Sequence, residues 1–496
     1  MEAVCEKKIR PFGAKDKWAY AMGDFGCNMS FALKNYITVF YTLYVGIDPT
    51  TMGIIILLLN IWDGINDPIV GALVDRLKPG KHGKFKPWIF WGALALIVSG
   101  AMVFLPSPEF TDSKVLKIII CILGYLTWDL AYTVVNVPYG SMASVITANT
   151  DERAHLSKYR SIGAMIAGLP VGIIVPMIIY KDRVVNGVKV INPETGKVVQ
   201  DLIGMNVFIM ALILGVVGFF AFMILIKGSI ERVQPEVKAD DEVKEKVSYI
   251  EVIKSFLKNR SAVGLTIASF FQLIMMQGLS TANTVLFKDL FGKADLSGII
   301  QMISYIPMVA AIAFVNPLVK KYGKKKCSTV PLVAGVIGGA LMAIIPNDGG
   351  TAGLVIWIAL QAVVSSSVAI LALISWAMIV DCIDYQELNT GRREEGTVYA
   401  IYSFGRKFAQ GVGAAAVLII MGWLGFQEAK NGGATPTQAD DVVNRIRILV
   451  GIVHAVCCLA QFLAMQYIYD LDKKKVEEMQ QKLGRVNEVL APHPED

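Results

Sequence analysis

Twelve long apolar stretches follow one another along the chain, separated by short polar or charged segments. About 20 apolar residues cross a bilayer as an α-helix, so each stretch is long enough for one span. The predicted spans are 18–45, 51–77, 87–105, 114–140, 158–181, 202–226, 260–290, 295–319, 327–345, 351–380, 396–426 and 443–470. The pattern predicts an all-α membrane protein with twelve transmembrane helices.

A charged segment without an apolar run divides these spans into two sets of six. We therefore expect an N-terminal six-helix bundle over 1–226, a cytoplasmic linker over 227–259, a C-terminal six-helix bundle over 260–470 and a cytoplasmic tail over 471–496. Basic residues gather at the amino terminus, after the second span and after the eighth span. By the positive-inside rule both termini are cytoplasmic.

The loop 182–201 then lies outside the cell, where its alternating pattern and Asn-Gly dipeptide predict a small surface hairpin.

The two halves share a feature at matching positions. GALVDRLKPGKHGKFKP follows the second span and NPLVKKYGKKK follows the eighth. Two six-helix halves with a basic loop in the same place suggest the parallel repeat of major-facilitator transporters, with a substrate cavity between the halves. A chance match between two basic loops is the alternative.

Composition agrees with a membrane protein and argues against enzyme chemistry. Hydrophobic residues make up 54% of the chain and charged residues 18%, against about 25% charged in soluble domains. The seven cysteines form no C-x-x-C pair, and the four histidines are scattered. We expect no enzyme activity, no organic cofactor and no nucleic-acid partner, and we expect the lipid bilayer as surroundings.

Paired carboxylates inside a predicted span suggest a cation site. Asp63 and Asp67 are four residues apart in LLLNIWDGINDPIVGALVD and share a helix face, with Asn60 three residues before Asp63. Like charges this close repel in a low dielectric unless a cation lies between them, and hard oxygen ligands suit Na⁺ or a proton. The alternative is that both aspartates form salt bridges to basic residues on other helices.

Other polar residues within the spans are candidates for substrate binding, because ionisable groups in a membrane are costly and by default functional. On the fourth span Asp129, Thr133 and Asn136 share one face, and Trp128 and Tyr132 form an aromatic stripe beside it, an arrangement that resembles a sugar-binding surface. The same groups could instead bond helices to one another. The remaining candidates are Asp24, Lys34, Arg160 and Lys407. We interpret His454 and the stretch FFQLIMMQG as ordinary interior packing.

The segment WDGINDPIVGALVDRLKPGKHGKFKPW resembles the glycoside–pentoside–hexuronide cation symporters, the family of the melibiose carrier within the major facilitator superfamily. The resemblance continues through LAYTVVNVPYGSMASVIT, DERAHLSKYR and VDCIDYQELNTGRREEGTVYAIYSFGRKFAQ, so it spans essentially the whole chain. It implies cation-coupled symport of a sugar glycoside by alternating access, in a bacterial cytoplasmic membrane.

The resemblance also implies residue roles. Asp63 and Asp67 would bind the coupling cation, Thr133 would contribute to that site, and Arg160 and Lys407 would lie where the sugar and cation sites meet.

This sequence departs from the melibiose carrier at its sugar-binding positions. Asn28 and Asn136 stand where the carrier has aspartates, and Gly140 stands where it has a tryptophan. The pattern is closer to the bacterial glucuronide carriers. A hexuronide and a neutral glycoside or pentoside both stay open as substrates, as do Na⁺ and H⁺ as coupling ions. A lysolipid carrier of the same superfamily and a non-transporting sugar sensor are the alternative functions.

Overall fold

Helices dominate the computed structural model, which describes residues 10–76, 80, 83–147, 149–192, 197–232, 256–390, 395–429 and 435–483. The first half contains α1 (Ala14–Phe31), α2 (Lys34–Phe40), α3 (Pro49–Arg76), α4 (Lys86–Val103), α5 (Lys114–Ile146), α6 (Thr150–Ile179) and α7 (Gly204–Gly228). The second half contains α9 (Arg260–Val285), α10 (Ser297–Tyr322), α11 (Lys324–Ile344), α12 (Thr351–Thr390), α13 (Glu395–Trp423), α14 (Asp440–Leu463) and α15 (Lys473–Lys482). The π-helical segments η1 (Tyr41–Val45), η3 (Leu286–Leu290) and η4 (Ala464–Ile468) extend α2, α9 and α14, and the 3-10 turn η2 (Ser107–Glu109) precedes α5.

The predicted spans agree with these helices to within a few residues, with four exceptions. The first span is not continuous, α5 runs on to Ile146, α6 already begins at Thr150, and α12 runs on to Thr390. Ten helices of the described chain are long and apolar enough to cross a bilayer. The first predicted span is broken at Ala32 and Leu33 into α1 and α2. Both residues keep right-handed helical dihedrals, and α2 begins directly after them, at Lys34.

Local sequence explains where the first two spans are joined. Gly46 has a φ of 85°, a left-handed conformation that glycine adopts without strain, and it ends η1. Asp48 then accepts a hydrogen bond at Oδ1 from the amide of Thr51, at 2.8 Å, and Pro49 is the first residue of α3. An acidic N-cap residue followed by proline is a typical helix start. The local sequence therefore fixes the residue at which α3 begins.

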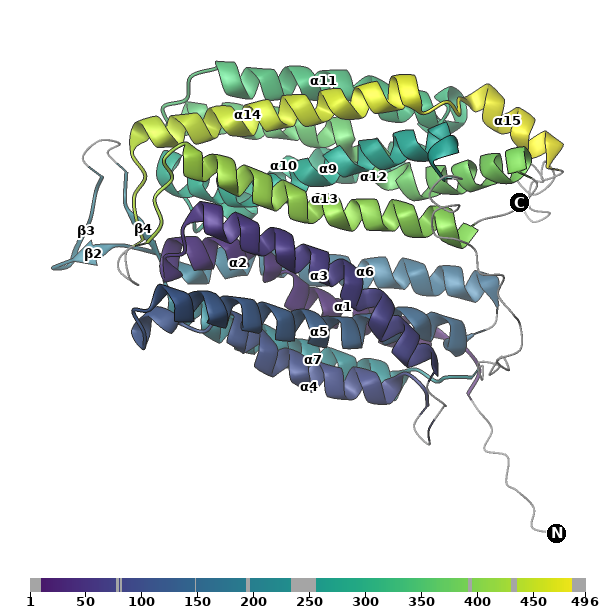
Figure 1. The fold of residues 1–496 in the computed structure, drawn as a ribbon, viewed down its shortest axis with the longest axis horizontal. Coiled ribbons are helices and arrows are strands. Elements are labelled where there is room, and N and C mark those ends of the chain that lie inside the picture. Colours follow the sequence, from purple (N-terminus) through teal and green to yellow (C-terminus); the bar gives the residue numbers. More distant parts are fainter. Residues whose placement is uncertain are drawn as a thin grey trace, which may run out of the picture.

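The helices form two groups that lie side by side (Figure 1). Helices α1 to α7, purple to blue-green, make the lower group, and α9 to α14, teal to yellow, make the upper group. The groups meet where α3 packs against α13, α6 against α10 and α2 against α9. The functional residues predicted from sequence lie on the helices of this interface and on their neighbours.

Two glycines allow the groups to approach closely. A Cβ atom on Gly298 of α10 would lie 1.7 Å from the carbonyl oxygen of Gly172 on α6, and one on Gly411 of α13 would lie 2.5 Å from Cβ of Asn60 on α3. Small residues permit such contacts between helices in a membrane, where van der Waals packing stabilises association.

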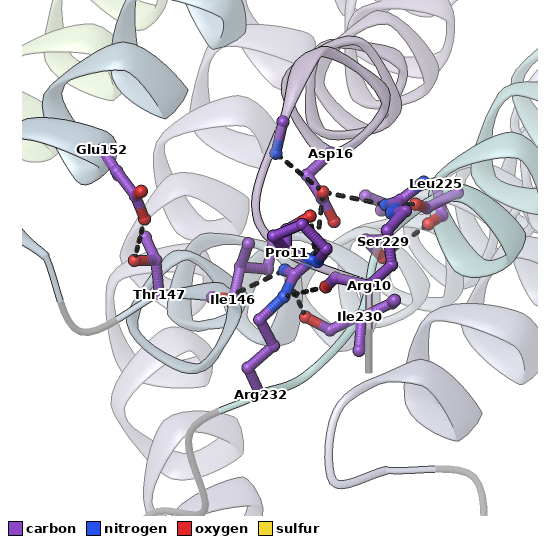
Figure 2. Close-up of polar contacts among 12 residues, drawn as sticks. Arg10, Pro11, Asp16, Ile146, Thr147, Glu152, Leu225, Ser229, Ile230 and Arg232 are labelled. Atoms are coloured by element: carbon purple, nitrogen blue, oxygen red, sulfur yellow. Dashed lines mark hydrogen bonds and ion pairs between the residues drawn. The ribbon is translucent and has the colours of Figure 1, made fainter. Parts of the chain in front are cut away.

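A buried charge cluster holds together the end of the first group that carries the amino terminus (Figure 2). Asp16 is fully buried and accepts ion pairs from Nη2 of Arg10, at 2.8 Å, and from Nη2 of Arg232, at 3.0 Å. Arg232 also donates to the carbonyl oxygens of Pro11 and Ile146. The amino-terminal segment, α5 and the chain after α7 are thereby joined at one point.

The opposite end of the molecule carries the loop that the sequence predicts to be a hairpin, and that prediction is confirmed. Strand β1 (Tyr180–Asp182) pairs antiparallel with β4 (Gln200–Leu202), and β2 (Val184–Val185) pairs with β3 (Val188–Lys189). Asn186 and Gly187 have φ values of 52° and 79°, as an Asn-Gly turn requires. We call this end of the molecule the hairpin end.

Replacing Gly298 with valine should destabilise the protein, because the new side chain would clash with the backbone of Gly172. Overpacking of this kind costs about 1–3 kcal/mol, which should appear as a lower melting temperature of the purified protein in detergent. Gly168→Val is the matched control, since Gly168 lies on α6 with open space around it. Equal melting temperatures for the two variants would contradict the close contact.

Candidate functional site

Asp63 on α3 lies between two lysines from different parts of the molecule. Lys34 Nζ is 3.6 Å from its Oδ2 atom, and Lys407 Nζ is 3.7 Å from its Oδ1 atom. Lys34 comes from α2 in the first half and Lys407 from α13 in the second. The salt bridges considered as the alternative for this carboxylate therefore exist in this conformation, and they join the two halves. The side chain of Asp67 lies outside the described part of the structure.

A second polar group links α3 to α5. The amide nitrogen of Asn66 donates to Asp129 Oδ2 at 3.3 Å and to Thr133 Oγ1 at 3.1 Å, and all three residues are buried. Asp129 and Thr133 share a helix face, as their spacing predicts. Sequence analysis missed Asn66 as a site residue, although it stands three positions after Asp63, a spacing that places both residues on one side of α3.

Asn60 takes a different position from the one expected. Its amide nitrogen donates to the carbonyl oxygen of Ile56 in its own helix, at 2.8 Å, and the residue packs against Gly411. It lines a cavity and is not part of the ion pairs around Asp63. Among the residues the structure describes, no group of three or more His, Cys, Asp or Glu side chains could hold a metal ion.

A second charge pair lies on the first and fifth spans. Arg160 Nε is 2.9 Å from Asp24 Oδ1, and the amide nitrogen of Asn28 donates to Asp24 Oδ2 at 3.1 Å. The guanidinium group of Arg160 also lies 5.3 Å from the ring centroid of Tyr139. Asn136 is close by, since its Oδ1 atom accepts from the Cys27 thiol at 3.9 Å. Four of the predicted substrate-binding residues are thus neighbours.

The aromatic stripe of α5 is part of the packed interior. Tyr132 stacks on Trp128 with ring centroids 5.7 Å apart and meets Phe31 at 5.5 Å. The indole nitrogen of Trp128 donates to Ser30 Oγ at 2.8 Å, and Trp128 is buried. These contacts tie α5 to α1 and hold Asp129 and Thr133 in place.

A cavity lies between the two halves. We call it the central cavity. Lys34, Asn60 and Tyr125 contribute to its wall from the first half, and Asn35 and Thr38 on α2 add polar groups. The second half supplies Gln277, Ser280, Thr281, Gln410 and Ala414. Because Lys34 also pairs with Asp63, the cavity and the carboxylate cluster are adjacent.

Comparison of the sequence with known protein families identifies the family of the chain. Residues 19–473 match the family described as MFS/sugar transport protein. The chain belongs to this family. The match covers nearly the whole sequence, and the resemblance to glycoside–pentoside–hexuronide symporters is confirmed by named relatives.

Three curated relatives of the MFS/sugar transport family are similar over most of their length. The glucuronide carrier protein homolog of Escherichia coli strain K12 is 24% identical over 93% of each chain. The isoprimeverose transporter of Lactiplantibacillus pentosus is 26% identical over 84% of this chain and 82% of its own. A putative glycoside/cation symporter of the same Escherichia coli strain, YagG, is 24% identical over 95% and 94%. The chain is thus similar to sugar and glycoside–cation symporters, which are transporters and not enzymes.

A solved structure shows the fold of the MFS/sugar transport chain. A variant of the nucleoside transporter NupG superposes with a TM-score of 0.58 and 16% identity, covering 91% of this chain and 98% of its own. The predicted major-facilitator fold is confirmed.

The helix α9 corrects one sequence interpretation. The pattern of FFQLIMMQG predicts ordinary packing, yet Gln277 lines the central cavity, and Gln272, Met275 and Met276 line another. The available signal was the spacing of Gln277, Ser280 and Thr281, which places three polar side chains on one helix face. His454 is buried, as expected, but it too lines that other cavity.

Replacing Asn66 with alanine should weaken the protein, because Asp129 and Thr133 would lose the donor they share. Removing a buried partner costs about 1–3 kcal/mol, measurable as a lower melting temperature of the purified protein. Thr127→Val on α5 is the control, since its hydroxyl bonds only to carbonyl oxygens of its own helix. If Asn66→Ala melted like the wild type, the hydrogen bonds between α3 and α5 would be unimportant.

Proposed function

We propose that this protein imports a neutral sugar glycoside together with one monovalent cation, Na⁺ or H⁺, by alternating access. The two six-helix groups would rock about the central cavity, with both termini in the cytoplasm of a bacterial cell and the hairpin end outside. The observation that carries the proposal is the central cavity, which has polar walls from both halves and adjoins the Asp63 cluster.

The charges of the predicted site residues support a single cation. Four carboxylates (Asp24, Asp63, Asp67 and Asp129) stand against three basic groups (Lys34, Arg160 and Lys407). In their ionised forms these residues carry one net negative charge, which one bound cation neutralises. Unbalanced charge is costly inside a membrane, so a loaded site of this composition favours a substrate without charge. A hexuronide would bring the net charge back to minus one.

Coupling follows from competition for Asp63. A cation bound to Asp63 would replace the ammonium groups of Lys34 and Lys407. The ion pairs that join the two halves through Asp63 would then break. A cation that favours one conformation must raise substrate affinity in that conformation, and the substrate must tighten cation binding by the same factor. The amide and hydroxyl groups of the cavity suit sugar hydroxyls, and this lining disfavours the lysolipid alternative.

Polar contacts from the hairpin to the second half support a gate. Asp201 Oδ1 accepts from Arg183 Nη2 at 2.5 Å and from the amide of Thr435 at 3.1 Å, while Arg183 donates to the Thr435 carbonyl at 2.7 Å. Gln200 donates to Asp295 Oδ1 at 3.0 Å and accepts from the amide of Ala294 at 2.7 Å. These contacts close the hairpin end in this conformation, and alternating access requires that they break.

Elsewhere on the hairpin, Lys189 and Asp182 pair with each other, and none of their described hydrogen bonds reaches the second half. Lys189 Nζ lies 2.6 Å from Asp182 Oδ2, and hydrogen bonds from Lys189 and Gln200 hold the pKa of Asp182 below its usual value. Both Lys189 and Asp182 belong to the hairpin itself, so this pair provides a control for the gate.

Uptake of an aryl glucoside and the matching aryl glucuronide, with and without Na⁺, tests the substrate and the ion. We expect concentrative uptake of the glucoside in cells expressing the chain. Asp63→Asn should reduce accumulation to background while the protein still inserts into the membrane, because the carboxylate that binds the cation is gone. Uptake of the glucuronide alone would contradict a neutral substrate, and full accumulation by Asp63→Asn would contradict cation binding at this residue.

The gate is tested with a cysteine placed at Gln410 in the central cavity and a membrane-impermeant thiol reagent added outside the cell. Arg183→Gln should speed labelling of this cysteine by about tenfold, since hydrogen bonds to a charged group contribute about 1.5–3 kcal/mol each. Lys189→Gln, the control on the same hairpin, should leave the rate unchanged. Equal rates in the two variants would mean that the hairpin does not hold this end closed.

A further inference from the structure

We propose that a second cavity, inside the C-terminal group, is an uncharged subsite for a neutral sugar ring of a two-ring glycoside. This inference rests on the proposed transport of glycosides and adds to it where the second ring binds. The cavity lies between α9, α12 and α14. We call it the inner cavity.

The inner cavity is adjacent to the central cavity. Ser280 on α9 contributes to the walls of both. A substrate with two linked rings could therefore place one ring beside Lys34 in the central cavity and the other beyond Ser280.

Two hydrogen-bond acceptors in the wall have no partner among the described residues. The side-chain oxygens of Asn283 on α9 and Gln361 on α12 are both buried and unpaired. Buried polar groups are nearly always hydrogen-bonded in folded proteins, because leaving one unpaired costs free energy. The two oxygens belong to facing helices, and both residues line one cavity. This arrangement indicates that a hydrogen-bond donor from outside the chain pairs with them.

A third acceptor follows from the orientation of His454. Its Nδ1 atom lies 2.8 Å from the carbonyl oxygen of Val450, and a carbonyl oxygen can only accept, so Nδ1 carries the proton. In the neutral ring the remaining nitrogen, Nε2, is then an acceptor.

The chemistry of the wall selects the class of ligand. The lining residues include no carboxylate and no basic side chain apart from this imidazole. Acceptors of this kind repel an anion, and a metal cation would find no negative charge to balance it. Hydroxyl donors suit them, and Met275, Leu279 and Val364 supply apolar surface for the C–H face of a sugar ring. A neutral, hydroxyl-rich ring fits both requirements.

The test compares one-ring and two-ring probes in the full-length protein. Initial uptake rates are measured for isoprimeverose against methyl α-xyloside, and for cellobiose against methyl β-glucoside. Asn283→Leu and Gln361→Met remove the two acceptors with little change of volume. Each should raise KM about tenfold for the disaccharide that the wild type transports and leave KM for its one-ring partner within twofold.

Controls separate binding from folding and the subsite from transport itself. Ser366→Ala on α12 should behave as the wild type, because its hydroxyl bonds only to the carbonyl of Ala362. Melting temperatures should not fall in either variant, since an apolar group replaces an unpaired buried one.

An equal change in KM for the one-ring and two-ring probes, or no change for either, would overturn the subsite. Water would then be the hydrogen-bond partner of these oxygens. A wild type that transports only the one-ring probes would overturn the subsite alone. A wild type that transports no glycoside would overturn the proposed function as well.

Discussion

The pairing of Asp63 with two lysines is the interaction on which the rest of the site depends. A carboxylate within a membrane must be balanced by positive charge, and here the balance comes from α2 on one side and α13 on the other. The same pair of contacts that makes the charge tolerable also joins the two halves of the molecule. Any ion that binds Asp63 therefore changes both the local electrostatics and the contact between the halves.

The two halves are held together at the hairpin end by contacts of a different kind. Glycines let the backbones of α6 and α10 come into contact. Thr435 accepts hydrogen bonds from the side chain of Arg183 and from the backbone amide of Leu202. Individually these contacts are modest, and most involve backbone groups that water can replace. A closure built from several weak, hydratable contacts can open without breaking a hydrophobic core, which suits an alternating-access cycle.

The charged residues of the candidate site are distributed unevenly between the halves. Asp24, Asp63, Asp129, Lys34 and Arg160 all belong to the first half, whereas the second half contributes amides and hydroxyls to the cavities and one lysine, Lys407. In the proposed mechanism, this division would place ion binding in the first half and leave the second half to recognise hydroxyl groups. Lys407 is the residue of the second half that pairs with Asp63 of the first.

The sequence by itself determined the class of protein and most of the charged candidates. Twelve apolar stretches predict the helices because hydrocarbon allows no unpaired backbone groups, and a carboxylate such as Asp63 is conspicuous in an apolar run. The spacing of Asp129 and Thr133 also predicted their shared face, since helical geometry is local.

Only the tertiary structure decided which residues meet. Asn66 bridges two helices, Lys34 lies beside Asp63, and Gln277 faces a cavity that exists only when two halves pack together. Neutral polar residues give little signal in a sequence because the same amide can bond its own helix, as Asn60 does, or a partner far along the chain. Long-range packing chooses between these outcomes, and periodicity along a single helix carries no information about its neighbours.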